Sequence, residues 1–194
     1  TCGVKNDHSM WCWGYTGEGQ FGNGSMYFGT YPDVEWRSLT PVPAMGGLPV
    51  KGLALGWYHA CVRTIDDHFY CTGQNDNVQA GQPRAMSWIP MLSVADTSYV
   101  SVSGGSNYAC ALDGVGAAWC WGYNGSGQTG LGQSAGQYVL LPQRIGTETW
   151  SQLSTGSNHA CGIKASDASL WCWGENNNGQ LGLNDTAIRW EPVQ

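Results

Sequence analysis

Residues 150–182 read WSQLSTGSNHACGIKASDASLWCWGENNNGQLG, and the core of this pattern recurs along the 194-residue chain. In each copy two cysteines flank a short turn, and a glycine-rich stretch that ends in a Gln follows the second cysteine. The other copies begin TCGVKNDHSMWCWG at Thr1, ACVRTIDDHFYCTG at Ala60 and ACALDGVGAAWCWG at Ala109. Self-similarity at a period of about 50 residues is the signature of a repeat architecture.

The copies are in register from the Pro to the next Cys, whereas the first copy has about nine extra residues between Gly22 and Pro41, which we interpret as a surface loop insertion. In each copy a Pro follows the Gln, and in the first three copies an apolar run then leads to a G-x-x-[HY]-A-C entry into the next copy. We therefore expect one repeat region over residues 1–194, with copies at about 1–49, 50–98, 99–149 and 150–194. The shared residues are Gln20, Gln79, Gln128 and Gln180, followed by Pro41, Pro90, Pro142 and Pro192.

Each copy predicts short β-strands joined by tight turns. Runs such as ACGIK and SLWCWG are rich in strand-forming residues, and turn formers such as Ala-Ser-Asp separate them. Three to four short strands in a repeat of about 50 residues make one propeller blade, and a blade with two apolar faces must stack on its neighbours. The predicted fold class is all-β: a β-propeller of about four blades, each a short antiparallel sheet with an intra-blade disulfide hairpin.

Composition excludes several classes of protein. The chain carries a net charge of −6 and no run of basic residues, so a nucleic-acid partner is not expected. Its 11 Trp and 9 Tyr exclude a disordered chain, which would lack aromatic residues. No apolar stretch approaches the ~20 residues of a membrane-spanning helix.

The pattern W-x-x-[LV]-S-x-G-x-x-H-[AT]-C-G…G-x-L-W-C-W-G-x-N-x-x-G-Q-L-G resembles the repeats of the regulator of chromosome condensation family over essentially the whole chain. The resemblance implies a β-propeller, of which full-length members commonly have about seven blades. Family members include a nuclear nucleotide exchange factor, a plant photoreceptor and a secreted β-lactamase inhibitor, so the fold alone implies no single function. This chain is acidic, unlike the nuclear founder, and where the photoreceptor has a Trp-Arg motif it has Trp57 followed by Tyr58.

The eight cysteines fall into one pair per copy. A hairpin within each copy places its two cysteines opposite each other, at a separation that a disulfide can bridge. The alternative is a zinc site, but the chain has no C-x-x-C pair and two thiolates per copy cannot complete four ligands. Four disulfides predict an oxidising compartment, and hence a secreted or cell-surface protein. The predicted pairs are Cys2–Cys12, Cys61–Cys71, Cys110–Cys120 and Cys161–Cys172.

Three N-glycosylation sequons begin at Asn23, Asn124 and Asn184, all in glycine-rich stretches. They agree with a secreted protein, although Asn-Gly is also ordinary turn chemistry. We therefore treat these three residues as glycosylation candidates.

The Trp residues have two possible roles. Trp11 and Trp13 lie on one face of their strand, and their repetition in other copies favours a core between blades over a sugar-stacking platform. Trp36 and Trp88 lie in irregular connections instead, and are candidates for a binding surface. His59, Tyr108 and His159 share one repeat position. Because Tyr replaces His there, we expect a hydrogen bond that stabilises the turn rather than a catalytic or metal-binding role.

No convergent set of catalytic side chains can be assembled, so we expect no enzyme activity, cofactor or metal. The predicted function is non-catalytic extracellular recognition, adhesion or scaffolding, with a protein or glycan partner at the loop surface. The loops concerned are 23–40, 74–88 and 131–141. A secreted enzyme inhibitor and a carbohydrate-binding module are the alternatives.

The sequence also predicts that a ring closed by these four copies alone would lack one inner strand. The copies have 19 or 20 steps from the Pro to the next Cys, whereas two residues follow Pro192 and one precedes Cys2. A longer parent chain would supply the strand most simply. Self-association, with a strand from a neighbouring subunit, is the alternative.

Overall fold

The computed structural model describes residues 1–25, 35–81, 87–92 and 99–194, with the side chains of Ser87, Trp88 and Pro90 excepted. These residues form antiparallel β-sheets and two three-residue 3-10 turns, η1 (Met45–Gly47) and η2 (Gln133–Ala135). The all-β prediction is confirmed. The short strands follow from alternating apolar and polar residues with glycines at the breaks.

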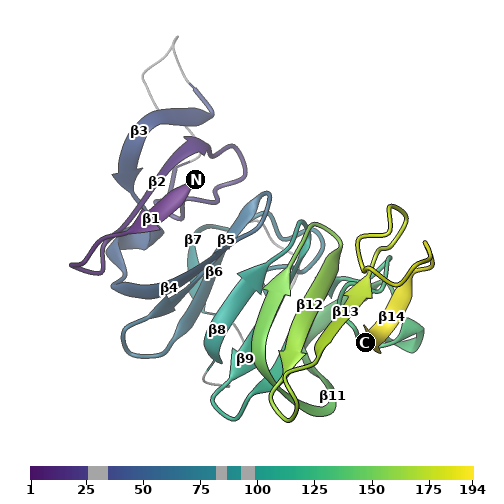
Figure 1. Cartoon of the computed structure of the whole chain (residues 1–194). Coiled ribbons are helices and arrows are strands. Elements are labelled where there is room, and N and C mark those ends of the chain that lie inside the picture. Colours follow the sequence, from purple (N-terminus) through teal and green to yellow (C-terminus); the bar gives the residue numbers. More distant parts are fainter. Residues whose placement is uncertain (26–34, 82–86, 93–98) are drawn as a thin grey trace.

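The sheets are blades stacked along an arc (Figure 1). The first blade has three strands: β1 (Cys2–Val4), β2 (Met10–Tyr15) and β3 (Arg37–Pro43). The second blade has four: β4 (Val50–Leu55), β5 (His59–Thr64), β6 (Phe69–Gly73) and β7 (Ser87–Leu92). In both, the two cysteine-bearing strands are adjacent, as the repeat predicts.

The third and fourth blades share one strand. They form a sheet of seven strands, in which the 18-residue β11 pairs with β10 along its first part and with β12 along its second. The third blade is therefore β8 to β11 and the fourth is β11 to β14. Their strands are β8 (Tyr99–Gly104), β9 (Tyr108–Asp113), β10 (Ala117–Tyr123), β11 (Tyr138–Thr155), β12 (His159–Lys164), β13 (Leu170–Gly174) and β14 (Arg189–Val193).

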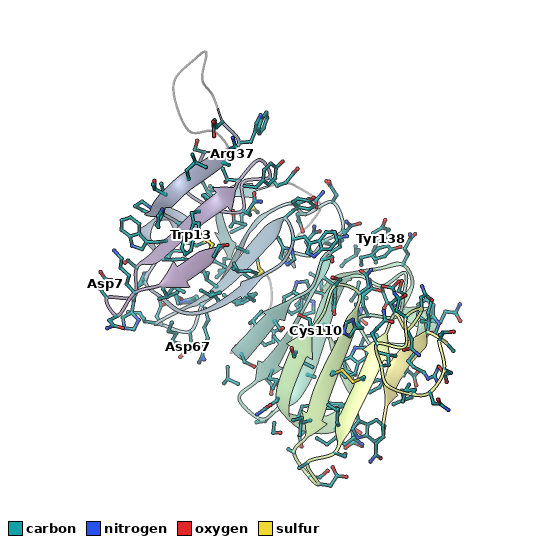
Figure 2. All side chains as sticks on the ribbon, turned by 45° about the horizontal axis from the view of Figure 1, so that its top comes forward. Asp7, Trp13, Arg37, Asp67, Cys110 and Tyr138 are labelled. Carbon is teal, nitrogen blue, oxygen red and sulfur yellow. A yellow bond between two sulfur atoms is a disulfide. The ribbon has the colours of Figure 1, made fainter. Side chains whose placement is uncertain are left out.

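The arc has two faces. The turns between the disulfide-linked strands lie on one face, which we call the hairpin face; Asp7 and Asp67 mark it in Figure 2. The G-x-x-[HY] turns and the glycine-rich loops lie on the other, the loop face, where Arg37 and Tyr138 are labelled. The repeat therefore separates a face of short turns from a face of longer, more variable loops.

Hydrogen bonds from one blade to the backbone of the preceding blade fix the stacking. The indole N–H of Trp121 donates to the carbonyl of Gln79 at 3.0 Å, and that of Trp173 donates to the carbonyl of Gln128 at 3.1 Å. Both indoles are fully buried. The degenerate second copy has Thr72 in place of Trp, and its hydroxyl donates to the carbonyl of Gly19 at 2.9 Å.

The side chains that pack at two repeat positions differ in size from one blade interface to the next, and the differences compensate each other. Phe69 of the second blade packs edge-on against Tyr99 of the third, with ring centroids 5.9 Å apart. At the next interface Ala118 and Trp150 occupy the same two repeat positions, in one buried cluster. A smaller residue on one blade is thus matched by a larger residue on the next, which keeps the interior close-packed.

The recurring Pro lies in the outer strand of each blade, as in Pro41 of β3 and Pro192 of β14. A proline has no backbone N–H to offer to another strand, so it blocks pairing at an exposed edge. This gives a physical reason for the repeat position.

Candidate binding surface on the loop face

All four predicted disulfides are present in the structure, each within one blade. The paired cysteines face each other in the hairpin register, with Cα atoms 4.1 Å apart. No cysteine among the described residues is free, and four disulfides are typical of a protein from an oxidising environment.

The glycine-rich loops are closed by their own side chains. In the third copy, Asn124 Oδ1 accepts from the Thr129 backbone N–H and hydroxyl, and Gln128 Oε1 accepts from the Ser126 N–H at 2.8 Å. The side-chain oxygens of Asn75 and Gln79 accept equivalent backbone bonds in the second copy, and those of Asn176 and Gln180 accept them in the fourth. The shared Gln therefore closes its loop, and these loops form a rigid frame.

Because Asn124 closes its loop, it is not a suitable glycosylation site. Asn124 is fully buried, and its amide nitrogen donates to the carbonyl of Gly136 at 3.1 Å, so a glycan cannot be attached without breaking the loop. Asn184 is exposed in a left-handed turn, and Asn23 is partly exposed with its oxygen on the Ser25 N–H. Asn184 and Asn23 remain predictions.

The Trp residues of the W-C-W-G runs divide between two roles. Burial and the hydrogen bonds of Trp121 and Trp173 confirm a core between blades. The first Trp of the run is half-buried near the hairpin face; Lys164 Nζ lies 3.8 Å from the ring centroid of Trp171, as Lys5 does over Trp11 at 3.9 Å.

Of the two binding-surface candidates, Trp36 is 48% exposed, and its carbonyl accepts from the Thr16 N–H at 2.7 Å. Trp36 thus lies beside Tyr15 at the end of β2. Trp88 belongs to β7, but its side chain lies outside the described residues. Residues 26–34, half of the predicted 23–40 loop, also lie outside them.

The structure shows an aromatic cluster that the sequence analysis did not identify. Tyr15, Trp57 and Tyr58 are 50%, 65% and 39% exposed on the loop face of the first two blades. The rings of Tyr15 and Tyr58 meet edge-on, with centroids 6.2 Å apart. The three residues line a cleft of about 470 Å³ together with Glu18 and His59. We call this the aromatic cleft.

Trp57 and Tyr58 replace the Ser and Asn of the corresponding turns in the third and fourth copies. In those copies the turns are bonded to each other, as Ser106 N–H donates to the Ser157 carbonyl at 3.0 Å. The departure from the repeat at positions 57 and 58 is the sequence signal that could have predicted the aromatic cleft. A position that departs from a structural pattern is free to serve another role.

Glu18 is the one carboxylate among the described residues that line the aromatic cleft. Burial lowers the pKa of His59 to about 4, so its imidazole is neutral near pH 7. Burial, and then the negative charge of Glu18, raise the pKa of the Tyr15 hydroxyl. Thr1 also lines the cleft, and its backbone nitrogen donates to the Trp13 carbonyl at 2.9 Å.

The shared His/Tyr position does not act as expected in every copy. The hydroxyl of Tyr108 donates to the carbonyls of Gly156, at 3.2 Å, and His159 in the next blade. His59 is buried, but neither of its ring nitrogens has a hydrogen-bond partner among the residues that the structure describes. It packs so closely on Gly56 that a Cβ there would lie 2.0 Å from the His59 ring. The predicted hydrogen bond is therefore wrong for His59, which fills space instead.

Within the described ranges, no three His, Cys, Asp or Glu side chains gather as a metal site would require. No helix in the same ranges is long and apolar enough to cross a membrane.

Models of the regulator of chromosome condensation (RCC1) repeat match residues 50–79, 150–180 and 167–194. The ultraviolet-B receptor UVR8 of Arabidopsis thaliana is 27% identical over 97% of this chain and 42% of the receptor. The probable E3 ubiquitin-protein ligase HERC4 of Rattus norvegicus is 26% identical over 94% of this chain and 17% of the ligase.

Among solved structures, Prp20p of Saccharomyces cerevisiae, described with its binding to Gsp1p and histones, superposes with a TM-score of 0.84. It is 18% identical, and the match covers 99% of this chain and 47% of that one. The chain thus spans less than half the length of these relatives. The repeat matches and the shared propeller fold agree: segments of this disulfide-bonded chain match regulator of chromosome condensation repeats, and its fold is that of the propeller in Prp20p.

Proposed function

We propose that this chain is a non-catalytic recognition module that works outside the cell and binds a partner protein through the aromatic cleft. The observation that carries the proposal is the exposure of Tyr15, Trp57 and Tyr58 around one cleft. Exposed Trp and Tyr side chains are the residues that most often dominate the energy of protein interfaces.

The loops around the aromatic cleft support this role because they are held in place. The Tyr58 carbonyl accepts from the Gln74 N–H at 2.8 Å, which ties the turn to the next loop of its blade. The Glu18 N–H donates to Gln20 Oε1 at 3.1 Å. A pre-organised surface loses little conformational entropy on binding, so more of its contact energy contributes to affinity.

Four disulfides support an extracellular location, since they persist in oxidising compartments. The names and titles of the relatives describe a receptor and a protein that binds Gsp1p and histones, which agrees with recognition. A carbohydrate-binding module and a secreted enzyme inhibitor would use the same surface, and adhesion would be its cellular outcome.

A direct test is to probe a phage-displayed peptide library and a printed glycan array with the wild-type chain and with Trp57→Ala. We expect selected peptides that lose binding in the variant. Val115→Ala is a matched control, because Val115 is 78% exposed in a turn on the hairpin face. Glycan hits lost in Trp57→Ala would favour the carbohydrate-binding alternative. Binding that Trp57→Ala leaves unchanged would contradict a role for the aromatic cleft.

Self-association is a second proposal. In the described sheets β5, β9 and β12 each have an inner strand beside them, whereas β1 forms the edge of its sheet. Leu170 of the fourth blade is 60% exposed, although the residues at its repeat position are buried in the other blades. Sedimentation of the 194-residue chain tests this, and a monomer at all concentrations would contradict it.

A further inference from the structure

The aromatic cleft has the shape of a cage rather than of a flat platform. The planes of Tyr15 and Tyr58 meet at 73°, so the two rings form adjoining walls. Trp57 precedes Tyr58 in the same turn and lines the same space. Aromatic ring faces carry partial negative charge, and several rings around one space form a favourable site for a cation.

The charged side chain that lines the aromatic cleft is also negative. Glu18 is its one carboxylate among the described lining residues, and its field reaches the Tyr15 hydroxyl. His59 adds no positive charge near pH 7. A carboxylate beside aromatic rings adds direct ion pairing to the attraction of the rings.

Arg37 is the strand neighbour of Tyr15, but its Nε lies 2.9 Å from Glu35 Oε2. Glu18, by contrast, has no ion-pair partner within the described part of the chain. The net charge of −6 further attracts cationic partners.

We propose that the aromatic cleft binds an organic cation, presented as the side chain of an arginine or lysine of a partner protein; this rests on the function proposed above. The cation would lie between the rings of Tyr15, Trp57 and Tyr58 with its charge toward Glu18. A sugar fits less well, because stacking needs a flat exposed ring face and the Oε1 of Gln20 is already used by the Glu18 N–H.

The test measures the binding of two short peptides to the full 194-residue chain by NMR titration. One is acetyl-Gly-Arg-Gly-amide, and the other has citrulline in place of the arginine. Citrulline keeps the shape of arginine without its charge. We expect the arginine peptide to bind about tenfold more tightly, and added salt to weaken it. Glu18→Gln and Trp57→Leu should each weaken it about fivefold. Glu175→Gln, on the loop face of the fourth blade, is the matched control and should leave it unchanged.

The outcomes separate the two proposals. Equal binding of the arginine and citrulline peptides would overturn the cation site. If library peptides still depended on Trp57, the recognition function would stand without it. Choline and its neutral isostere 3,3-dimethylbutanol form the second arm. Choline binding well above that of the arginine peptide would assign a small quaternary ammonium ligand and overturn the partner side chain.

Discussion

The indole N–H of Trp173 donates a 3.1 Å hydrogen bond to the backbone carbonyl of Gln128 in the preceding blade. The same loop brings Gly130 against the indole, where a Cβ would lie 2.8 Å from Nε1. The Gln-x-Gly of one repeat and the Trp of the next therefore form one interface, which makes the repeat a unit of stacking as well as of folding.

Trp173→Phe should destabilise the chain by about 1–3 kcal/mol, because it leaves the buried Gln128 carbonyl without a donor. Equilibrium unfolding in urea measures the change. Trp57→Phe serves as control, and its cost should stay within about 0.5 kcal/mol because Trp57 is 65% exposed. Equal effects of the two substitutions would show that the hydrogen bond contributes nothing.

Because the small Ala118 packs beside the large Trp150, we predict that these two positions are coupled in stability. Ala118→Phe alone should cost about 1–3 kcal/mol, because it overpacks the space beside Trp150. Ala118→Phe with Trp150→Tyr recreates the Phe69–Tyr99 pair of the preceding interface. The double variant should be more stable than the sum of the single variants, as measured by a double-mutant cycle. Strict additivity would show that the two positions do not share one space.

Cys110→Ala with Cys120→Ala should lower the free energy of unfolding by about 2–3 kcal/mol, since the link closes a short loop in the unfolded chain. Peptide mapping without reduction should recover all four links within their own blades. A link between cysteines of two blades would contradict the hairpin pairing.

His59 predicts a loss of stability in acid. Its pKa is about 4 when folded and about 6.5 when exposed, so the unfolded chain binds the proton first as pH falls. The stability that depends on neutral His59 is complete above pH 6.5 and falls by about 3 kcal/mol towards pH 4, with little change below. His59→Tyr, the residue found at position 108, should remove this slope from urea unfolding curves measured across that range. A slope that persists in the variant would place its origin in another group.

Expression in a eukaryotic secretory pathway should add a glycan at Asn184 and none at Asn124. The reason is that Asn184 is exposed, whereas both ends of the Asn124 amide are bonded inside its loop. Mass spectrometry of the intact chain and of Asn184→Gln reports the occupancy. A glycan on Asn124 of the folded chain would contradict the loop structure.

The sequence predicted the fold and the disulfides because both depend on the repeat. Cys61 and Cys71 were predicted to pair locally, because every copy carries two cysteines 10 or 11 positions apart. Periodicity could not predict the aromatic cleft, which exists because Trp57 and Tyr58 depart from the repeat and because stacking brings Tyr15 of another blade beside them. The burial of Asn124 was equally hidden, because its local sequence reads as an exposed turn and only the folded loop shows its amide engaged.

The 18-residue strand β11 has a mechanical consequence. It carries hydrogen bonds to the third blade along its first part and to the fourth along its second, without an intervening loop. Tension between these two blades must therefore shear a strand held along both parts rather than straighten a slack connection. The first and second blades are joined instead through the short turn η1, with its left-handed Gly46. The last two blades are therefore coupled through one continuous hydrogen-bonded strand, whereas the first two are joined by a turn whose Met45 is buried in a cluster shared by both blades.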